Sequence, residues 1–102
     1  MVEVINLRTC KDWGKPGDMK IDRTTKWGNP FVMRIESERD DVCNKYELWL
    51  DKQLRQKKLD IKDLKTAKRL GCHCNPKRCH GDYLKKKIEE YQMFSSQQSL
   101  NL

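Results

Sequence analysis

The segment at residues 68–82 limits the fold more than any other part of the chain. Residues 68–74 are typical of a compact strand, which ends in Cys-His-Cys. An Asn-Pro pair at 75–76 breaks this strand, and a helix is expected to start near residues 79–80 and to end near residue 94. A strand, a turn and a helix in this order are typical of α/β domains, where ligands usually bind at the carboxyl ends of strands.

The rest of the chain supplies partners for this unit. Residues 2–7 are rich in β-branched side chains and predict a first strand. The irregular stretch at 12–30, punctuated by glycine and proline, is expected to hold a short strand near residues 19–23. Residues 60–64 are typical of a short helical turn.

The clearest helix is expected at residues 37–56. Ser37 is a suitable N-cap, and two aspartates follow it at the positive end of the helix dipole. Side chains at helical spacing define one buried face: Val42, Tyr46, Trp49, Leu50 and Leu54. The helix that starts near residue 79 has a similar face of Leu84, Ile88 and Tyr91.

These elements predict an α/β fold in one small domain over residues 1–94, with a short parallel sheet flanked by two main helices. The polar residues 95–102 are expected to form a flexible tail. A chain of 102 residues is too short for two domains.

Composition narrows the classes of function. No apolar run approaches the roughly 20 residues that a membrane span needs, and the first residues lack the pattern of a signal peptide. We therefore expect a cytoplasmic protein without a membrane partner.

The formal charge of +7 favours an anionic partner such as a nucleotide or a nucleic acid, although a well-solvated surface explains it equally well. The oligomeric state is left open.

The densest chemistry is the cysteine–histidine cluster at residues 72–82, for which three interpretations stay open. In the first, Cys79, His80 and Asp82 are catalytic, because a cysteine at a helix N-terminus tends towards a lowered pKa and a reactive thiolate. Lys77 and Arg78 would add positive charge for a phosphate bound at the same place.

The second interpretation is a zinc site formed by Cys72, Cys74, Cys79 and His80, whose donor atoms suit tetrahedral coordination. Their spacing is unlike that of common paired zinc knuckles, and no other cofactor is expected. In the third interpretation the cluster is structural. The thiols then pack as small apolar groups, and Asp82 satisfies amide groups at the helix end.

Residues 26–31, here called the first box, read Lys-Trp-Gly-Asn-Pro-Phe, and the cluster at residues 72–82 is the second box. As a binding rim, it would stack Trp27 on a ring, hydrogen-bond the ring through Asn29 and pair Lys26 with phosphate. As architecture, it would be a turn whose aromatic side chains pack on the core.

The two boxes together resemble the domain-of-unknown-function family 4326. The resemblance rests on Lys-Trp-Gly-Asn-Pro-Phe at 26–31 and on Cys-x-Cys-x-Pro-x-x-Cys-His-Gly-Asp at 72–82, and it covers most of the chain. It implies that both boxes belong to one functional unit in a compact α/β domain of bacteria and viruses, so a viral member would work in the host cytoplasm. His73 stands where the family commonly has an aromatic residue.

We therefore expect a nucleotide or another phosphorylated ligand to bind between the 26–31 and 72–82 segments. The alternatives are a nucleic-acid-binding module that uses the basic second half of the chain, and a protein-interaction domain with a purely structural Cys/His cluster. The sequence does not decide whether the domain is an enzyme. It lacks the Gly-rich phosphate loop, the dinucleotide fingerprint, the serine elbow and the His-Glu-x-x-His helix.

Overall fold

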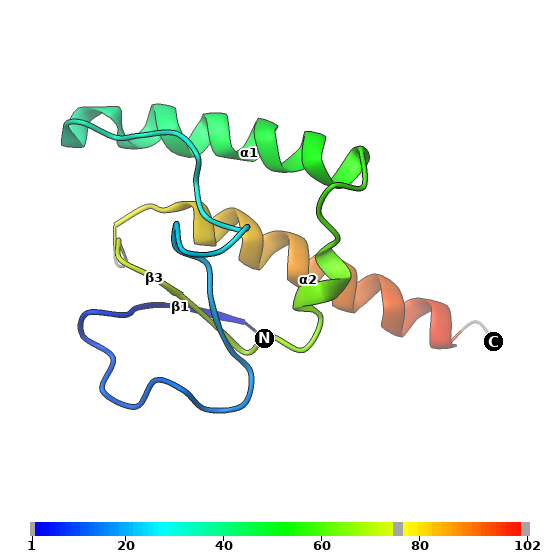
Figure 1. Cartoon of the computed structure of the whole chain (residues 1–102). Coiled ribbons are helices and arrows are strands. Elements are labelled where there is room, and N and C mark those ends of the chain that lie inside the picture. Colours follow the sequence, from blue (N-terminus) through cyan, green and yellow to red (C-terminus); the bar gives the residue numbers. More distant parts are fainter. Residues whose placement is uncertain (1, 75–76, 101–102) are drawn as a thin grey trace.

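The sheet of this domain has three parallel strands. The computed structural model describes residues 2–74 and 77–100, with side chains up to Met93 (Figure 1). Strands β1 (Glu3–Asn6), β2 (Asp18–Lys20) and β3 (Arg69–Cys72) lie in the order β1-β3-β2. The central strand β3 pairs in parallel with both neighbours, so the carboxyl ends of all three strands face one side of the domain.

Two helices complete the α/β fold that the sequence predicts. Helix α1 (Arg39–Arg55) follows the 3₁₀ turn η1 (Glu36–Glu38), and α2 (His80–Leu100) follows the turn after β3. A second 3₁₀ turn, η2 (Ile61–Leu64), matches the predicted helical turn, and Asp60 caps it by accepting the N–H of Lys62. Helix α2 packs against β1 and β3, and α1 packs against α2, so that α2 lies between the sheet and α1 (Figure 1).

The core lies between the sheet and the helices. Its fully buried side chains come from every layer: Val2, Ile21, Tyr46, Leu50, Leu64, Leu70, Leu84 and Ile88. The predicted faces of both helices are confirmed for most positions, because Val42 is also buried while Trp49 and Leu54 are partly buried against the core. Tyr91 is half-buried. Burial of these apolar groups is the main stabilising contribution.

The connection from β1 to β2 covers the opposite face of β3. Gly71 lies so close to this connection that an added Cβ would sit 2.5 Å from a Leu7 methyl and 2.7 Å from the Trp13 ring. Arg69 anchors the same connection, because its guanidinium donates to both Asp12 and Asp18. No helix in the described residues is long and apolar enough to cross a membrane.

Several predicted boundaries are wrong. The strands near 19–23 and 68–74 are shorter, because Asp22 accepts the N–H of Thr24 in a turn and the ladder on β3 ends at Cys72. Ser37 is not the N-cap of α1, because it lies inside η1 and Glu38 occupies the N-cap position. The Glu38 carboxylate accepts the N–H groups of Arg34 and Ile35, which precede η1.

Helix α2 starts where the sequence predicts but continues past residue 94 to Leu100. The residues between Phe94 and Leu100 include neither glycine nor proline, so nothing in them interrupts a helix. The flexibility of residues 95–102 stays a prediction, and residues 101–102 lie outside the described part of the chain. The predicted Asn-Pro break at 75–76 also lies outside it.

Candidate functional site

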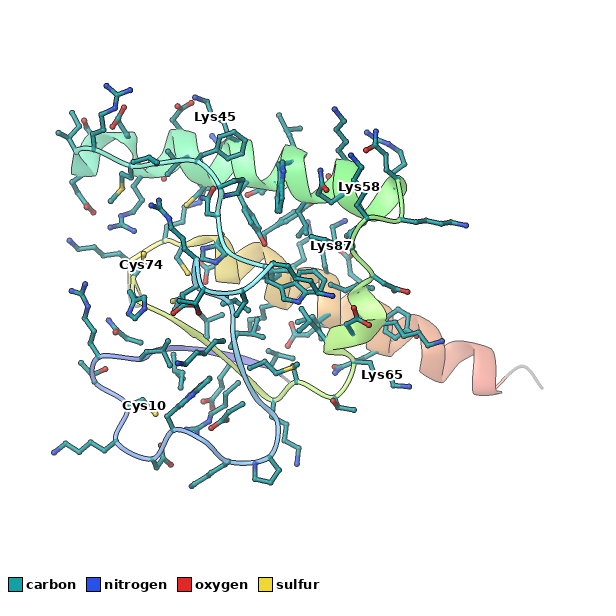
Figure 2. The ribbon with its side chains drawn as sticks, in the orientation of Figure 1. Cys10, Lys45, Lys58, Lys65, Cys74 and Lys87 are labelled. Atoms are coloured by element: carbon teal, nitrogen blue, oxygen red, sulfur yellow. The ribbon has the colours of Figure 1, made fainter. Side chains whose placement is uncertain are left out.

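A cavity of about 360 Å³ lies where the carboxyl ends of β2 and β3 meet the first turns of α1 and α2. Residues 22–24 after β2 and residues 72–74 at the end of β3 line it, together with Cys79 and His80. Figure 2 shows Cys74 where β3 leads into the turn towards α2, whereas Cys10 lies on the β1–β2 connection. The cavity thus occupies the usual ligand position of an open α/β sheet.

Cys79 and Asp82 begin helix α2 together. The backbone N–H of Gly81 donates to Cys79 Sγ at 3.2 Å, and the backbone N–H of Cys79 donates to Asp82 Oδ2 at 3.2 Å. This reciprocal arrangement resembles a capping box, with a thiol and an aspartate in place of Ser and Glu and with the N–H of Gly81, one residue before Asp82, donating to the thiol. Asp82 does not line the cavity. Both side chains therefore act in the way that the structural interpretation of the cluster expects.

The pKa of the Cys79 thiol is shifted in the opposite direction to the predicted lowering, and the reactive role of this thiol stays a prediction. A hydrogen bond with Cys72, whose Sγ lies 3.3 Å from Cys79 Sγ, raises the pKa of the Cys79 thiol, and burial raises this pKa further. The Gly81 N–H lowers it, but by less. The helix N-terminus therefore does not ionise this cysteine, because the thiol is enclosed beside a second sulfur.

His80 lines the cavity but is held by its surroundings. Its Nε2 lies 2.5 Å from the carbonyl oxygen of Ile21, which is an acceptor, so Nε2 carries the proton. The ring also packs edge-on against Tyr46, with centroids 4.9 Å apart. Burial lowers the pKa of His80, and the charge of Arg23 lowers it further, so the imidazole is neutral at pH 7.

The first box forms the turn that the architectural interpretation expects. Trp27 is buried in the core, does not line the cavity, and accepts a hydrogen bond from the Tyr46 hydroxyl on its backbone oxygen. Asn29 lines the cavity but is only 9% exposed. Its Nδ2 donates to the carbonyl of Val42, and its Oδ1 accepts the N–H of Phe31. Lys26 pairs with Asp63 at 3.0 Å, outside the cavity lining.

Among the predicted cations of the second box, only Arg78 reaches the cavity. Its guanidinium is shared between Asp40 and Glu47, each at 3.0 Å. Lys77 lies outside the cavity lining and is 3.5 Å from Glu36.

The cavity is also lined by two arginines, Arg23 and Arg39, that sequence reasoning did not select. Arg39 pairs with Glu36 at 2.7 Å and donates to the carbonyl of Arg78. Arg23 donates to the carbonyl of Phe31 at 3.2 Å, and within residues 2–74 and 77–100 it has no carboxylate partner. The sequence signal for Arg23 is its position just after a predicted strand, since the ends of parallel strands meet at one edge of the sheet.

Position at the end of a parallel strand would also have indicated Asp22 and His73, which sequence reasoning did not select as site residues. His73 Nε2 lies 3.1 Å from Asp22 Oδ2, and both residues line the cavity. Burial raises the pKa of Asp22, but hydrogen bonds from Thr24 and His73 outweigh it, and the pKa lies below its ordinary value. Asp22 is therefore an ionised carboxylate that accepts from His73.

The predicted zinc ligands do not converge as a set. Within the part of the chain that the structure describes, no group of three or more His, Cys, Asp or Glu side chains is arranged to hold a metal ion. Cys72 and Cys79 are adjacent, but His80 Nε2 faces Ile21, and Arg39 hydrogen-bonds Cys74. Zinc binding stays a prediction, which native mass spectrometry with and without a chelator tests.

Comparison with known proteins places the chain in a family. Residues 5–90 match the model of the Domain of unknown function (DUF4326), and the chain belongs to this family. It is 30% identical over 69 residues to the "Uncharacterized 12.4 kDa protein in nrdA-td intergenic region" of Enterobacteria phage T4. That match covers 66% of this chain and 63% of the phage protein. No solved structure matches significantly.

Proposed function

We propose that this domain binds a nucleotide, or another small phosphorylated ligand, in the cavity between its two boxes. The observation that carries the proposal is a cationic side chain without a carboxylate partner at the edge of this cavity. Arg23 makes only the hydrogen bond to the Phe31 carbonyl within the described residues, and a guanidinium has five N–H donors. Such a group suits a phosphate, which accepts two parallel hydrogen bonds from arginine.

The charges around the cavity leave Arg23 as its main binding group for an anion. Arg39 and Arg78 line the cavity too, but they are balanced by Glu36 in one case and by Asp40 and Glu47 in the other. These two guanidinium groups contribute a positive potential rather than unused donors.

The apolar part of the lining supports a ligand larger than a phosphate ion. Phe31, Met33 and Val42 contribute to the same cavity, whose volume of about 360 Å³ lies in the range of small-molecule sites. An inorganic phosphate would leave this apolar surface uncovered. A nucleotide would place its base there and its phosphate at Arg23.

The nucleic-acid alternative depends on the basic second half of the chain, where charge is partly neutralised. On α2, Lys85 pairs with Glu89 at 3.2 Å and Lys87 lies 3.6 Å from Asp51. These pairs reduce the positive potential of this helix, so the cavity is the better place for an anionic ligand.

An NMR titration tests the proposal. We expect ¹H–¹⁵N spectra of the full chain to shift on addition of 5′-AMP, GMP, CMP or UMP, with the largest changes at residues 22–24 and 72–74. Adenosine and inorganic phosphate are the matched probes for the two halves of the ligand, and each should bind more weakly than AMP. Shifts confined to α2, or no shifts with any nucleotide, would contradict the proposal.

A further inference from the structure

The Asp22–His73 pair joins the ends of β2 and β3 at the cavity. Its two polar atoms are 3.1 Å apart, and the side chain of His73 is 45% exposed while that of Asp22 is 12% exposed. Thr24 holds the carboxylate from the other side, because both its backbone N–H and its hydroxyl donate to Asp22 Oδ1. The carboxylate is therefore fixed, and the imidazole that it orients remains accessible to water.

The hydrogen bond to Asp22 determines which ring nitrogen of His73 is available. An ionised carboxylate only accepts hydrogen bonds, so Nε2 must carry the proton that lies towards Asp22. In the neutral ring, Nδ1 then has a lone pair, and it has no hydrogen-bond partner in the described part of the chain. A carboxylate orients a histidine and stabilises the imidazolium in the same way in the Ser-His-Asp triad, where the roles of the two ring nitrogens are exchanged.

We propose that His73 is a general base, positioned by Asp22, that activates water for hydrolysis of a phosphate ester bound in the cavity. The inference rests on the proposed function. Nδ1 removes a proton from water while the water oxygen bonds to phosphorus and the bond from phosphorus to the ester oxygen breaks. The departing oxygen, on the opposite side of phosphorus, takes a proton from solvent, and Nδ1 releases its proton to solvent, which gives the alcohol and inorganic phosphate and restores the neutral imidazole.

The neighbouring groups support this assignment. Arg23 lines the same cavity as Asp22 and His73, so a phosphate on Arg23 would be held in the cavity that the pair also lines. Arginine also stabilises the charge that develops on a reacting phosphoryl group. The other polar candidates at the cavity are held elsewhere, because His80 donates to Ile21 and the Cys79 thiol caps α2.

Phosphate release tests the inference separately from binding. We expect the full chain to release inorganic phosphate from a nucleoside 5′-monophosphate. His73→Gln and Asp22→Asn should each lower the rate at least about 100-fold, the lower end of the usual contribution of a general base. Both variants should still bind the nucleotide. Asp63→Asn is the matched control, because this exposed carboxylate pairs with Lys26 outside the cavity and its loss should leave the rate unchanged.

The outcomes separate the two proposals. Nucleotide binding without phosphate release, or a His73→Gln variant as active as the wild type, would overturn the inference and leave the proposed function standing. Absence of nucleotide binding would overturn both.

The tautomer of His73, measured by NMR, gives a further test of the general base that does not depend on activity. The chain has only two histidines, so long-range ¹H–¹⁵N spectra resolve the tautomer of each ring. We expect the Nε2–H tautomer at His73 in the wild type and a mixture of tautomers in Asp22→Asn. An Nδ1–H tautomer in the wild type would contradict the proposed base.

Discussion

At the scale of single residues, the thiols of Cys74 and Cys79 line the same cavity but have different surroundings. Cys74 is half-buried, whereas Cys79 is buried against Cys72 and has a raised pKa. Alkylation needs an accessible thiolate. We therefore expect iodoacetamide to label Cys74 well before Cys79 in the folded protein at pH 7.5, as measured by peptide mass spectrometry. Labelling of Cys79 first would contradict the enclosed thiol described here.

The Asp18–Arg69 ion pair predicts how the stability of the fold changes at acidic pH. The Arg69 guanidinium, 2.6 Å away, holds the pKa of Asp18 at about 2, below its ordinary value of 3.8. Because the pKa is lowered by folding, the stabilisation is complete above pH 3.8 and is lost as the pH falls towards 2.

We therefore expect the free energy of unfolding of the wild type to decrease over this pH interval, as measured by urea denaturation. Asp18→Asn should reduce that decrease. Part of it should persist, since Arg39 also holds the pKa of Glu36 at about 2. An unchanged slope in Asp18→Asn would show that this pair does not stabilise the fold.

At the scale of elements, the first box supports the turn that carries Asp22 and Arg23. Gly28 lies directly against this turn, and a Cβ at Gly28 would come 2.5 Å from the Asp22 carbonyl oxygen and 2.6 Å from the Arg23 Cα. Backbone atoms cannot move aside as a flexible side chain can. The box therefore affects the cavity through the backbone that it packs against.

Gly28→Ala tests this connection. We expect the variant to lose about 1–3 kcal/mol of unfolding free energy, the usual cost of overpacking, and to bind nucleotide more weakly because the Asp22–Arg23 backbone is displaced. Urea denaturation and calorimetric titration measure the two effects. Gly14→Ala is a useful comparison, because Gly14 has a positive φ of 108° but nothing within 4 Å of an added Cβ. Gly14→Ala should therefore reduce stability through backbone strain without weakening nucleotide binding.

At the scale of the whole molecule, periodicity and turn chemistry were enough to predict the α/β class and the strand–turn–helix unit at the second box. The buried faces of both helices follow from helical spacing alone. The boundaries of β2 and α1 could not be predicted, because they depend on which side chain captures a backbone N–H. Asp22 accepts the N–H of Thr24 just after β2, and Glu38 accepts the N–H of Ile35 ahead of η1, the 3₁₀ turn that leads into α1.

The cavity lies where the sequence predicts a site, and it contains some of the predicted residues, among them Asn29, Arg78 and His80, but not Lys26, Trp27 or Asp82. The sequence indicates that the two boxes lie together at the strand ends, and the cavity there contains residues of both. It does not reveal that Lys26 pairs with Asp63 or that Trp27 is buried, since both depend on contacts far along the chain. Arg23 belongs to neither box, and His73 is the position of the second box where this chain departs from the family pattern. The parallel pairing of β2 and β3 brings them to one cavity.

The affinity of the full chain for 5′-AMP, measured by isothermal titration calorimetry, tests the central claim most directly. A charge-assisted hydrogen bond contributes about 1.5–3 kcal/mol, so Arg23→Gln should raise the Kd roughly 10- to 100-fold. Lys26→Gln, which removes an exposed charge outside the cavity lining, should leave the Kd nearly unchanged. Equal losses in the two variants, or no binding by the wild type, would contradict a phosphate site at Arg23.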